Sequence, residues 1–162
     1  EDLAQFLAGI DTAFLATANA AGQPYTQHRG GPKGFIKILG PKTLGFADYK
    51  GNRQYITTGN LSENDRAFLF LMDYAQRRRV KLWGRARVVA DDDALVERLM
   101  LEGYAAKPEQ AILFEVEAWD INCPQHIPQK IDGADVARVL AGLQNRIAEL
   151  EAENTALRES GP

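Results

Sequence analysis

Two short basic segments contain the residues best suited to bind an anion. The first is Asn52-Arg53-Gln54, at the start of a segment, 52–61, that the sequence predicts to be a short helix. Backbone N–H groups at a helix start and an arginine guanidinium both bind phosphate well, so this spacing indicates a phosphate site. The second is Arg77-Arg78-Arg79, which is followed closely by Lys81. Strand alternation predicts that Arg78 points away from the face that the other three cations share.

The overall charge limits what this anion can be. The chain has 162 residues and a formal net charge of −3, and its sequence pI is about 5.4. Without a global positive field, it is not expected to bind nucleic acid or an anionic membrane surface. No segment approaches the roughly 18 apolar residues of a membrane span. A small ligand with a phosphate group is therefore favoured over a nucleic-acid site at 77–79, and an ordinary solvated turn there is an equal alternative.

Cysteine and histidine offer little chemistry. Cys123 is the single cysteine, so no intrachain disulfide can form, and a cytoplasmic location is expected. Cys123, His126 and His28 lack the paired spacing of a zinc motif, and no metal site is expected. Two histidines define no hydrolytic triad either, so catalytic residues cannot be assigned. A bound cofactor would have to supply any redox chemistry.

The elements expected around the basic segments are mainly strands. Residues 13–17 and 24–29 flank the turn Ala21-Gly22-Gln23, which predicts an antiparallel hairpin. A long strand interrupted by Gly84 is predicted from Val80 to Ala90. The whole pattern predicts a mainly β (α+β) fold, a small antiparallel barrel of six strands with helices at its periphery.

The C-terminal segment, residues 133–160, has a heptad pattern. Its seam residues alternate steps of four and three: Val136, Leu140, Leu143, Ile147, Leu150, Asn154 and Leu157. With Asn154 at an a position, this pattern predicts a parallel coiled-coil helix that acts as a dimer zipper. The alternative is an amphipathic helix that lies on its own barrel.

Several of these residues together resemble the pyridoxamine 5′-phosphate oxidase-like FMN-binding split-barrel family. The resemblance is carried by 45–54, by Asn64-Asp65-Arg66 and by 78–86, and it covers roughly residues 5–126. It implies a six-stranded antiparallel split β-barrel over residues 1–128 that binds FMN. It also implies a homodimer with the flavin at the interface.

The resemblance implies a set of cofactor-binding residues. Gly34 would allow close approach to the flavin ring, Arg53 would hold the phosphate, and Trp119 would pack near the flavin from the partner chain. The full expected set is Lys33, Gly34, Phe35, Lys37, Ala47, Asp48, Asn52, Arg53, Gln54, Arg78, Arg79, Lys81 and Trp119.

The chain departs from the family pattern at two cofactor-binding positions. Gln54 stands where the oxidase has a phosphate-binding lysine, and Arg79 stands where it has glutamine, so Arg79 is expected to compensate for Gln54. The heptad helix replaces the segment that recognises the vitamin substrate in the oxidase. We therefore expect an FMN-dependent oxidoreductase for another, unidentified small molecule. The alternative is a non-enzymatic flavin-binding or flavin-sensing module, and a deazaflavin or haem remains an alternative to FMN.

Overall fold

The structure, a computed structural model, describes residues 3–121, 124–159 and 161. These residues form two compact units, Glu1–Ile127 and Pro128–Pro162. Cys123, considered above as a metal ligand, lies outside the described residues.

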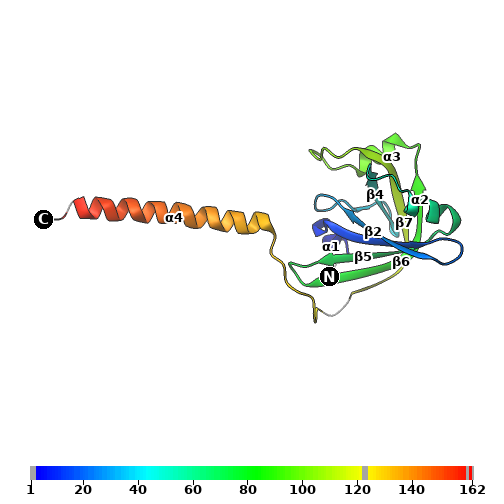
Figure 1. Cartoon of the computed structure of the whole chain (residues 1–162), viewed down its shortest axis with the longest axis horizontal. Helices are drawn as coiled ribbons and strands as arrows, with labels where there is room; N and C mark the ends of the chain where they lie inside the picture. The colour runs from blue at the N-terminus through cyan, green and yellow to red at the C-terminus, as the bar shows by residue number, and fades with distance from the viewer. Residues whose placement is uncertain (1–2, 122–123, 160, 162) are drawn as a thin grey trace. The chain divides into compact units, whose positions relative to one another are not determined.

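The first unit is built on one antiparallel sheet, as expected (Figure 1). The strand order is β2-β1-β5-β6-β7-β4-β3. The strands are β1 (Thr12–Ala18), β2 (Pro24–Gly30), β3 (Lys37–Ile38), β4 (Thr43–Tyr49), β5 (Arg66–Asp73), β6 (Arg78–Val89) and β7 (Pro108–Ile121). Within the described residues, this unit also contains the helices α1 (Leu3–Gly9), α2 (Ile56–Glu63) and α3 (Asp93–Leu99), and the second unit contains α4 (Gly133–Glu159).

The sheet has seven strands, and the expected count of six was wrong. The edge strand β3 is only two residues long and pairs with β4 through Lys37 and Gly45 and through Ile38 and Leu44. A pairing this short leaves almost no alternation to recognise in a sequence.

Alternating side chains explain how the sheet encloses its core. In β1, Ala13 and Leu15 are buried and their neighbours are only partly so. β5 repeats the pattern with Leu69 and Leu71, and β6 with Val80 and other small or apolar residues. The inward faces of the strands therefore form a single apolar core.

Gly84 marks a bulge in β6 rather than a break in the strand. The register between β6 and β7 shifts between Trp83 and Gly84. A Cβ atom added at Gly84 would lie 1.9 Å from the carbonyl oxygen of Glu115, so only glycine fits against β7 here. The long strand pair can bend at this point without losing its pairing.

The helix α2 begins at Ile56, four residues later than the sequence predicts. Arg53 and Tyr55 have φ values of 58° and 52°, which belong to the left-handed region that side-chain-bearing residues rarely adopt. The backbone therefore makes a tight, irregular turn from β4 into α2. Arg53 lies in this turn and not at the helix start.

The second unit contains α4, a single helix of 27 residues. Among its described residues none is buried. No described helix is long and apolar enough to cross a membrane.

Candidate functional site

The barrel is held together by side chains where its hydrogen-bonded sheet ends. β2 and the β4–β3 pair lie at opposite ends of the strand order, so no backbone ladder joins β2 to β4 among the described residues. Instead, Arg29 of β2 forms an ion pair with Asp48 of β4. Only 12% of each of these two side chains is exposed. The split in the barrel is therefore bridged by a nearly buried ion pair.

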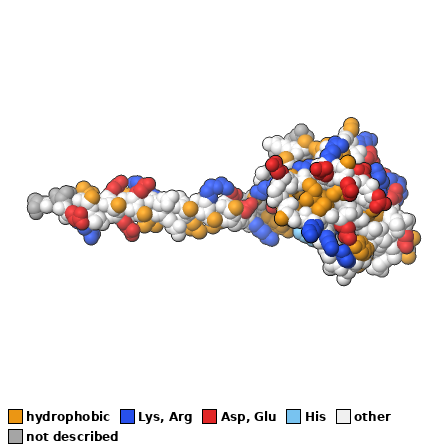
Figure 2. All heavy atoms as spheres, turned by 90° about the horizontal axis from the view of Figure 1, so that it is seen from above, with side chains coloured by type: hydrophobic (Ala, Val, Ile, Leu, Met, Phe, Trp, Pro, Cys, Tyr) orange, Lys and Arg blue, Asp and Glu red, His pale blue; other side chains and the backbone are white. Residues whose placement is uncertain are grey.

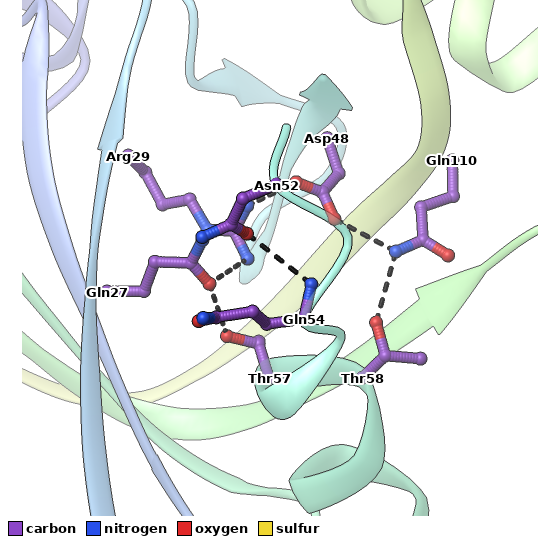
Figure 3. A network of polar contacts seen from close by, with 8 residues as sticks. All are labelled: Gln27, Arg29, Asp48, Asn52, Gln54, Thr57, Thr58 and Gln110. Carbon is purple, nitrogen blue, oxygen red and sulfur yellow. Dashed lines mark hydrogen bonds and ion pairs between the residues drawn. The ribbon is translucent and has the colours of Figure 1, made fainter. Parts of the chain in front are cut away.

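A polar network extends this bridge to two more elements (Figure 3). The second guanidinium nitrogen of Arg29 donates to Gln27 Oε1 over 3.1 Å, and Thr57 Oγ1 of α2 donates to the same oxygen over 2.8 Å. On the other side, Gln110 Nε2 of β7 donates to Asp48 Oδ2 over 2.9 Å. The network ties β2, β4, β7 and α2 together at one place.

Two adjoining pockets lie on either side of the ion pair. They share Gln27, Arg29, Asp48 and Tyr49, and they have volumes of about 50 and 160 Å³. The smaller pocket is lined by the turn before α2, and the larger one reaches Phe35 and Phe46. The Nε atom of Arg29 is buried and has no hydrogen-bond partner within the described chain. A buried donor without a partner beside a pocket is the kind of group that a ligand's acceptor atom would satisfy.

Arg53 is the uncommitted cation of the smaller pocket. Within the part of the chain that the structure describes, its side chain makes no hydrogen bond or ion pair, whereas Arg29 is already neutralised by Asp48. The two carboxylates of this pocket are also engaged, Asp48 as above and Glu109 by the hydroxyl of Tyr55, which donates to it over 2.6 Å. That hydrogen bond is the main cause that raises the pKa of Tyr55 above its ordinary value. An incoming anion would therefore meet Arg53 as the free positive charge.

The structure gathers six of the expected residues around these two pockets. Asn52, Arg53 and Gln54 line the smaller one, Phe35 and Ala47 line the larger one, and Asp48 lines both. The backbone N–H of Gln54 donates to Asn52 Oδ1 over 3.4 Å, which helps to define the turn.

Three other expected residues lie at a separate hollow. Lys33, Gly34 and Lys37 line a pocket of about 350 Å³ against α1. Gly34 has a φ of 79°, and an added Cβ would lie 3.3 Å from the carbonyl oxygen of Ala8. The positive φ of Gly34 and the nearby Ala8 carbonyl therefore explain why this position is glycine, without a ligand.

The arginine run divides into three different environments. Arg77 precedes β6 with a φ of 55°, so it does not share the strand's alternation as predicted. Its Nε donates to the Ile127 carbonyl over 3.1 Å, which fastens the segment after β7. Arg78 stacks on the Phe6 ring at 5.1 Å. Arg79, on the opposite strand face, has a buried Nε without a hydrogen-bond partner in the described chain.

Lys81 and Trp119 lie near the same end of the β6–β7 pair. Lys81 Nζ contacts Asp120 Oδ2 at 2.9 Å and lies 5.3 Å from the centre of the Trp83 ring. The side chain of Trp119 is about half exposed. None of Arg78, Arg79, Lys81 and Trp119 lines the two pockets beside Arg29.

Two routes through the sheet lead from the pocket to Arg79. Asp48, at the pocket, pairs with Gln110 near the beginning of β7, whereas Lys81 pairs with Asp120 near its end. Ten residues of strand correspond to about 33 Å. By the other route, the pairings of Arg29 with Ala13, Ala13 with Leu71 and Leu71 with Val80 lead in three steps, about 14 Å, to the residue next to Arg79. The expectation that Arg79 compensates for Gln54 therefore stays a prediction.

Aromatic side chains cross the outer face of the sheet from β2 to β6. Ring contacts run from His28 to Phe14, from Phe14 to Phe70, and through Phe68 to Trp83, with centroid separations of 5.2–6.4 Å. We call these five residues the aromatic stripe. It begins at His28, which lines the larger pocket, and ends at Trp83, which contacts Lys81.

Sequence reasoning missed Arg29, Gln27 and Gln110. The alternation in 24–29 places Gln27 and Arg29 on one face of the strand, and this was the available signal for the first two. The ion pair between Arg29 and Asp48 joins two strands that are not hydrogen-bonded to each other, so no local sequence pattern predicts it.

Comparison with known proteins agrees with this architecture. The family model for pyridoxamine 5′-phosphate oxidase matches residues 1–123. No curated protein sequence matches the chain.

Solved structures with the same fold share little sequence with the chain. HupZ from Group A Streptococcus is 15% identical with a TM-score of 0.59, over 80% of this chain and 100% of that one. An FMN-binding protein from Syntrophomonas wolfei is 12% identical with a TM-score of 0.58, over 74% and 84%. An F420 reductase is 17% identical with a TM-score of 0.50, over 74% and 98%.

Proposed function

The chain belongs to the pyridoxamine 5′-phosphate oxidase family, and from this we propose that it is an FMN-binding flavoprotein that acts as an oxidoreductase on a small molecule. The observation that carries the proposal is the pocket in which Arg53 is an uncommitted cation beside the Arg29–Asp48 bridge. An FMN-binding protein among the structural neighbours supports the choice of cofactor. The single cysteine suits the cytoplasm, which is the location we propose.

The phosphate of FMN would bind in the smaller pocket. Arg53 would supply the charge, and the side chains of Asn52 and Gln54 would supply further hydrogen-bonding groups. At about 50 Å³ this is the smaller of the two pockets, which suits the phosphate better than the ring. The ring would then extend past Ala47 into the larger pocket.

We propose that a second copy of the chain completes the site. The aromatic stripe is an apolar surface on the outer sheet face, and packing against its own copy would remove it from water. A two-fold axis that crosses the middle of the stripe places the His28 end of one copy on the Trp83 end of the other. This arrangement would bring the partner's Arg79, Lys81 and Trp119 towards the larger pocket, which His28 lines.

The flavin would supply electron and hydride transfer when bound. The chain's residues would position it and stabilise charge: Arg53 at the phosphate, and the cations of β6 near the ring. Because the C-terminal unit contains a long helix, we propose a substrate other than the vitamin that the oxidase uses.

A flavin-binding or flavin-sensing module without turnover is the second candidate. The observation in its favour is that both carboxylates of the smaller pocket already have partners, Asp48 in the ion pair and Glu109 with Tyr55. Neither is free to act as an acid or base as the structure stands. Steady turnover of the purified protein with an electron donor and acceptor would exclude this candidate.

The phosphate assignment can be tested by comparing FMN with riboflavin, which lacks the phosphate. Arg53→Ala is expected to raise the dissociation constant for FMN about 10- to 150-fold, the range for one hydrogen bond to a charged group. The constant for riboflavin should hardly change. Arg98→Ala, at an exposed position on α3, is the matched control. An equal loss for both ligands would show that Arg53 does not hold the phosphate.

A further inference from the structure

The helix α4 exposes a continuous apolar stripe. The stripe consists of Val136, Leu140, Leu143, Ile147, Leu150 and Leu157, whose side chains are 41–72% exposed, together with Asn154. Figure 2 shows hydrophobic side chains along this helix among charged ones. A helix of this length with an exposed seam gains most of its stability by burying that seam against another surface.

The spacing of the stripe specifies the kind of surface. Steps of four and three residues repeat over three heptads, which is the pattern of a coiled coil. With Leu140, Ile147 and Asn154 at position a, the flanking g positions are Arg146 and Glu153, and the e positions opposite them are Glu151 and Arg158.

The flanking charges match a second copy in parallel. In a parallel, in-register pair, each g residue faces the e residue five positions later on the partner. Arg146 then faces the partner's Glu151, and Glu153 faces the partner's Arg158. Both contacts are attractive, and each occurs twice by symmetry.

The same charges oppose a slipped register. A slip of one heptad brings Arg146 of one helix to the partner's Arg158, and the partner's Glu153 to Glu151 of the first helix. Both contacts become repulsive. Asn154 adds to this selection, because its amide can bond its symmetry mate only when the two helices are in register.

We propose that α4 forms a parallel, in-register two-stranded coiled coil with α4 of a second copy of this chain. This pairing is independent of the flavin, because its charges and apolar residues all lie within α4. It gives the protein a dimer contact in each of its two units.

One contact within the helix has to be separated from the contacts between chains. Arg146 Nη1 lies 2.9 Å from Glu149 Oε2 on the same helix. Replacing Arg146 therefore also removes an internal pair. Glu151 is five residues from Arg146 and does not face it within one helix, so compensation at 151 reports only on the partner.

Disulfide trapping in the full chain tests the pairing. In a Cys123→Ser background, Leu150→Cys places one thiol on the seam, and Ala152→Cys places one on the opposite side of the helix as the control. In-register parallel helices bring the two thiols at position 150 together. An antiparallel pairing of the same stripe puts Leu150 opposite Leu143, about 10 Å away along the axis, which is too far for a disulfide.

The expected result is rapid cross-linking of Leu150→Cys under mild oxidation and little for Ala152→Cys. Adding Arg146→Glu should slow cross-linking at position 150 about tenfold, since two attractive pairs become repulsive. Adding Glu151→Arg as well should restore it. Equal cross-linking at 150 and 152, none at 150, or no rescue by Glu151→Arg would overturn the proposal.

Discussion

Removal of the positive charge at Arg29 should unfold the barrel far more readily than removal at Arg85. Both arginines form ion pairs, Arg29 with Asp48 and Arg85 with Asp65 and Glu117. They differ in solvent exposure, because 12% of the Arg29 side chain is exposed and 47% of the Arg85 side chain. Substitution by methionine keeps most of the apolar stem and removes the charge in both cases.

The expected cost follows from the Asp48 carboxylate that Arg29→Met leaves behind. Breaking a fully buried pair costs about 3–5 kcal/mol. Asp48 here keeps some solvent contact and its hydrogen bond from Gln110, so we expect a loss of about 2–4 kcal/mol for Arg29→Met. Arg85→Met should leave the stability nearly unchanged, because exposed pairs are screened by water.

Urea unfolding followed by tryptophan fluorescence measures this difference. Both tryptophans, Trp83 and Trp119, lie in the barrel unit and report on it alone. With an m-value of about 1.5–2 kcal/mol/M, Arg29→Met should lower the urea midpoint by about 1–2 M. Equal midpoints for Arg29→Met and Arg85→Met would refute the idea that this ion pair holds the split of the barrel together.

Three further substitutions test other parts of the structure. Gly84→Ala should destabilise the barrel by about 1–3 kcal/mol in the same urea assay, because its methyl group would overlap the Glu115 carbonyl. Gly59→Ala in α2 is the control and should not destabilise the barrel, because the space at its Cβ is open. Arg77→Ala should speed proteolysis of segment 124–127, since it removes the bonds to the carbonyls of Ile127 and Pro124, and an unchanged cleavage rate would contradict this role. Asn154→Leu should raise the melting temperature of the helical signal in circular dichroism, and light scattering should detect species larger than a dimer. A lower melting temperature would contradict the assignment of Asn154 to an a position.

Much of the fold could be predicted because its signals are local. Alternation in β1 and turn residues between β1 and β2 predicted a hairpin, and the structure pairs Thr12–Ala18 with Pro24–Gly30. The heptad spacing likewise predicted the helix over 133–160, and α4 covers Gly133–Glu159. Each of these patterns can be recognised within one continuous segment of the chain.

The site was harder to predict because its main contacts are not local. Residues 29 and 48 meet because the barrel curves until β2 approaches β4. The sequence of neither strand predicts the strand order that brings them together. The sequence wrongly predicted helix at 52–55. Left-handed φ values are usually signalled by glycine or asparagine, but here they occur at Arg53 and Tyr55. The position of Arg79 relative to Arg29 likewise follows only from the register of four strands, β2, β1, β5 and β6.

The absorption spectrum of the freshly purified protein, with mass identification of any released chromophore, tests the central claim most directly. We expect the spectrum of an oxidised flavin and the mass of FMN, or stoichiometric binding of added FMN if the protein is purified without it. A colourless protein that does not bind added FMN would contradict the proposed function.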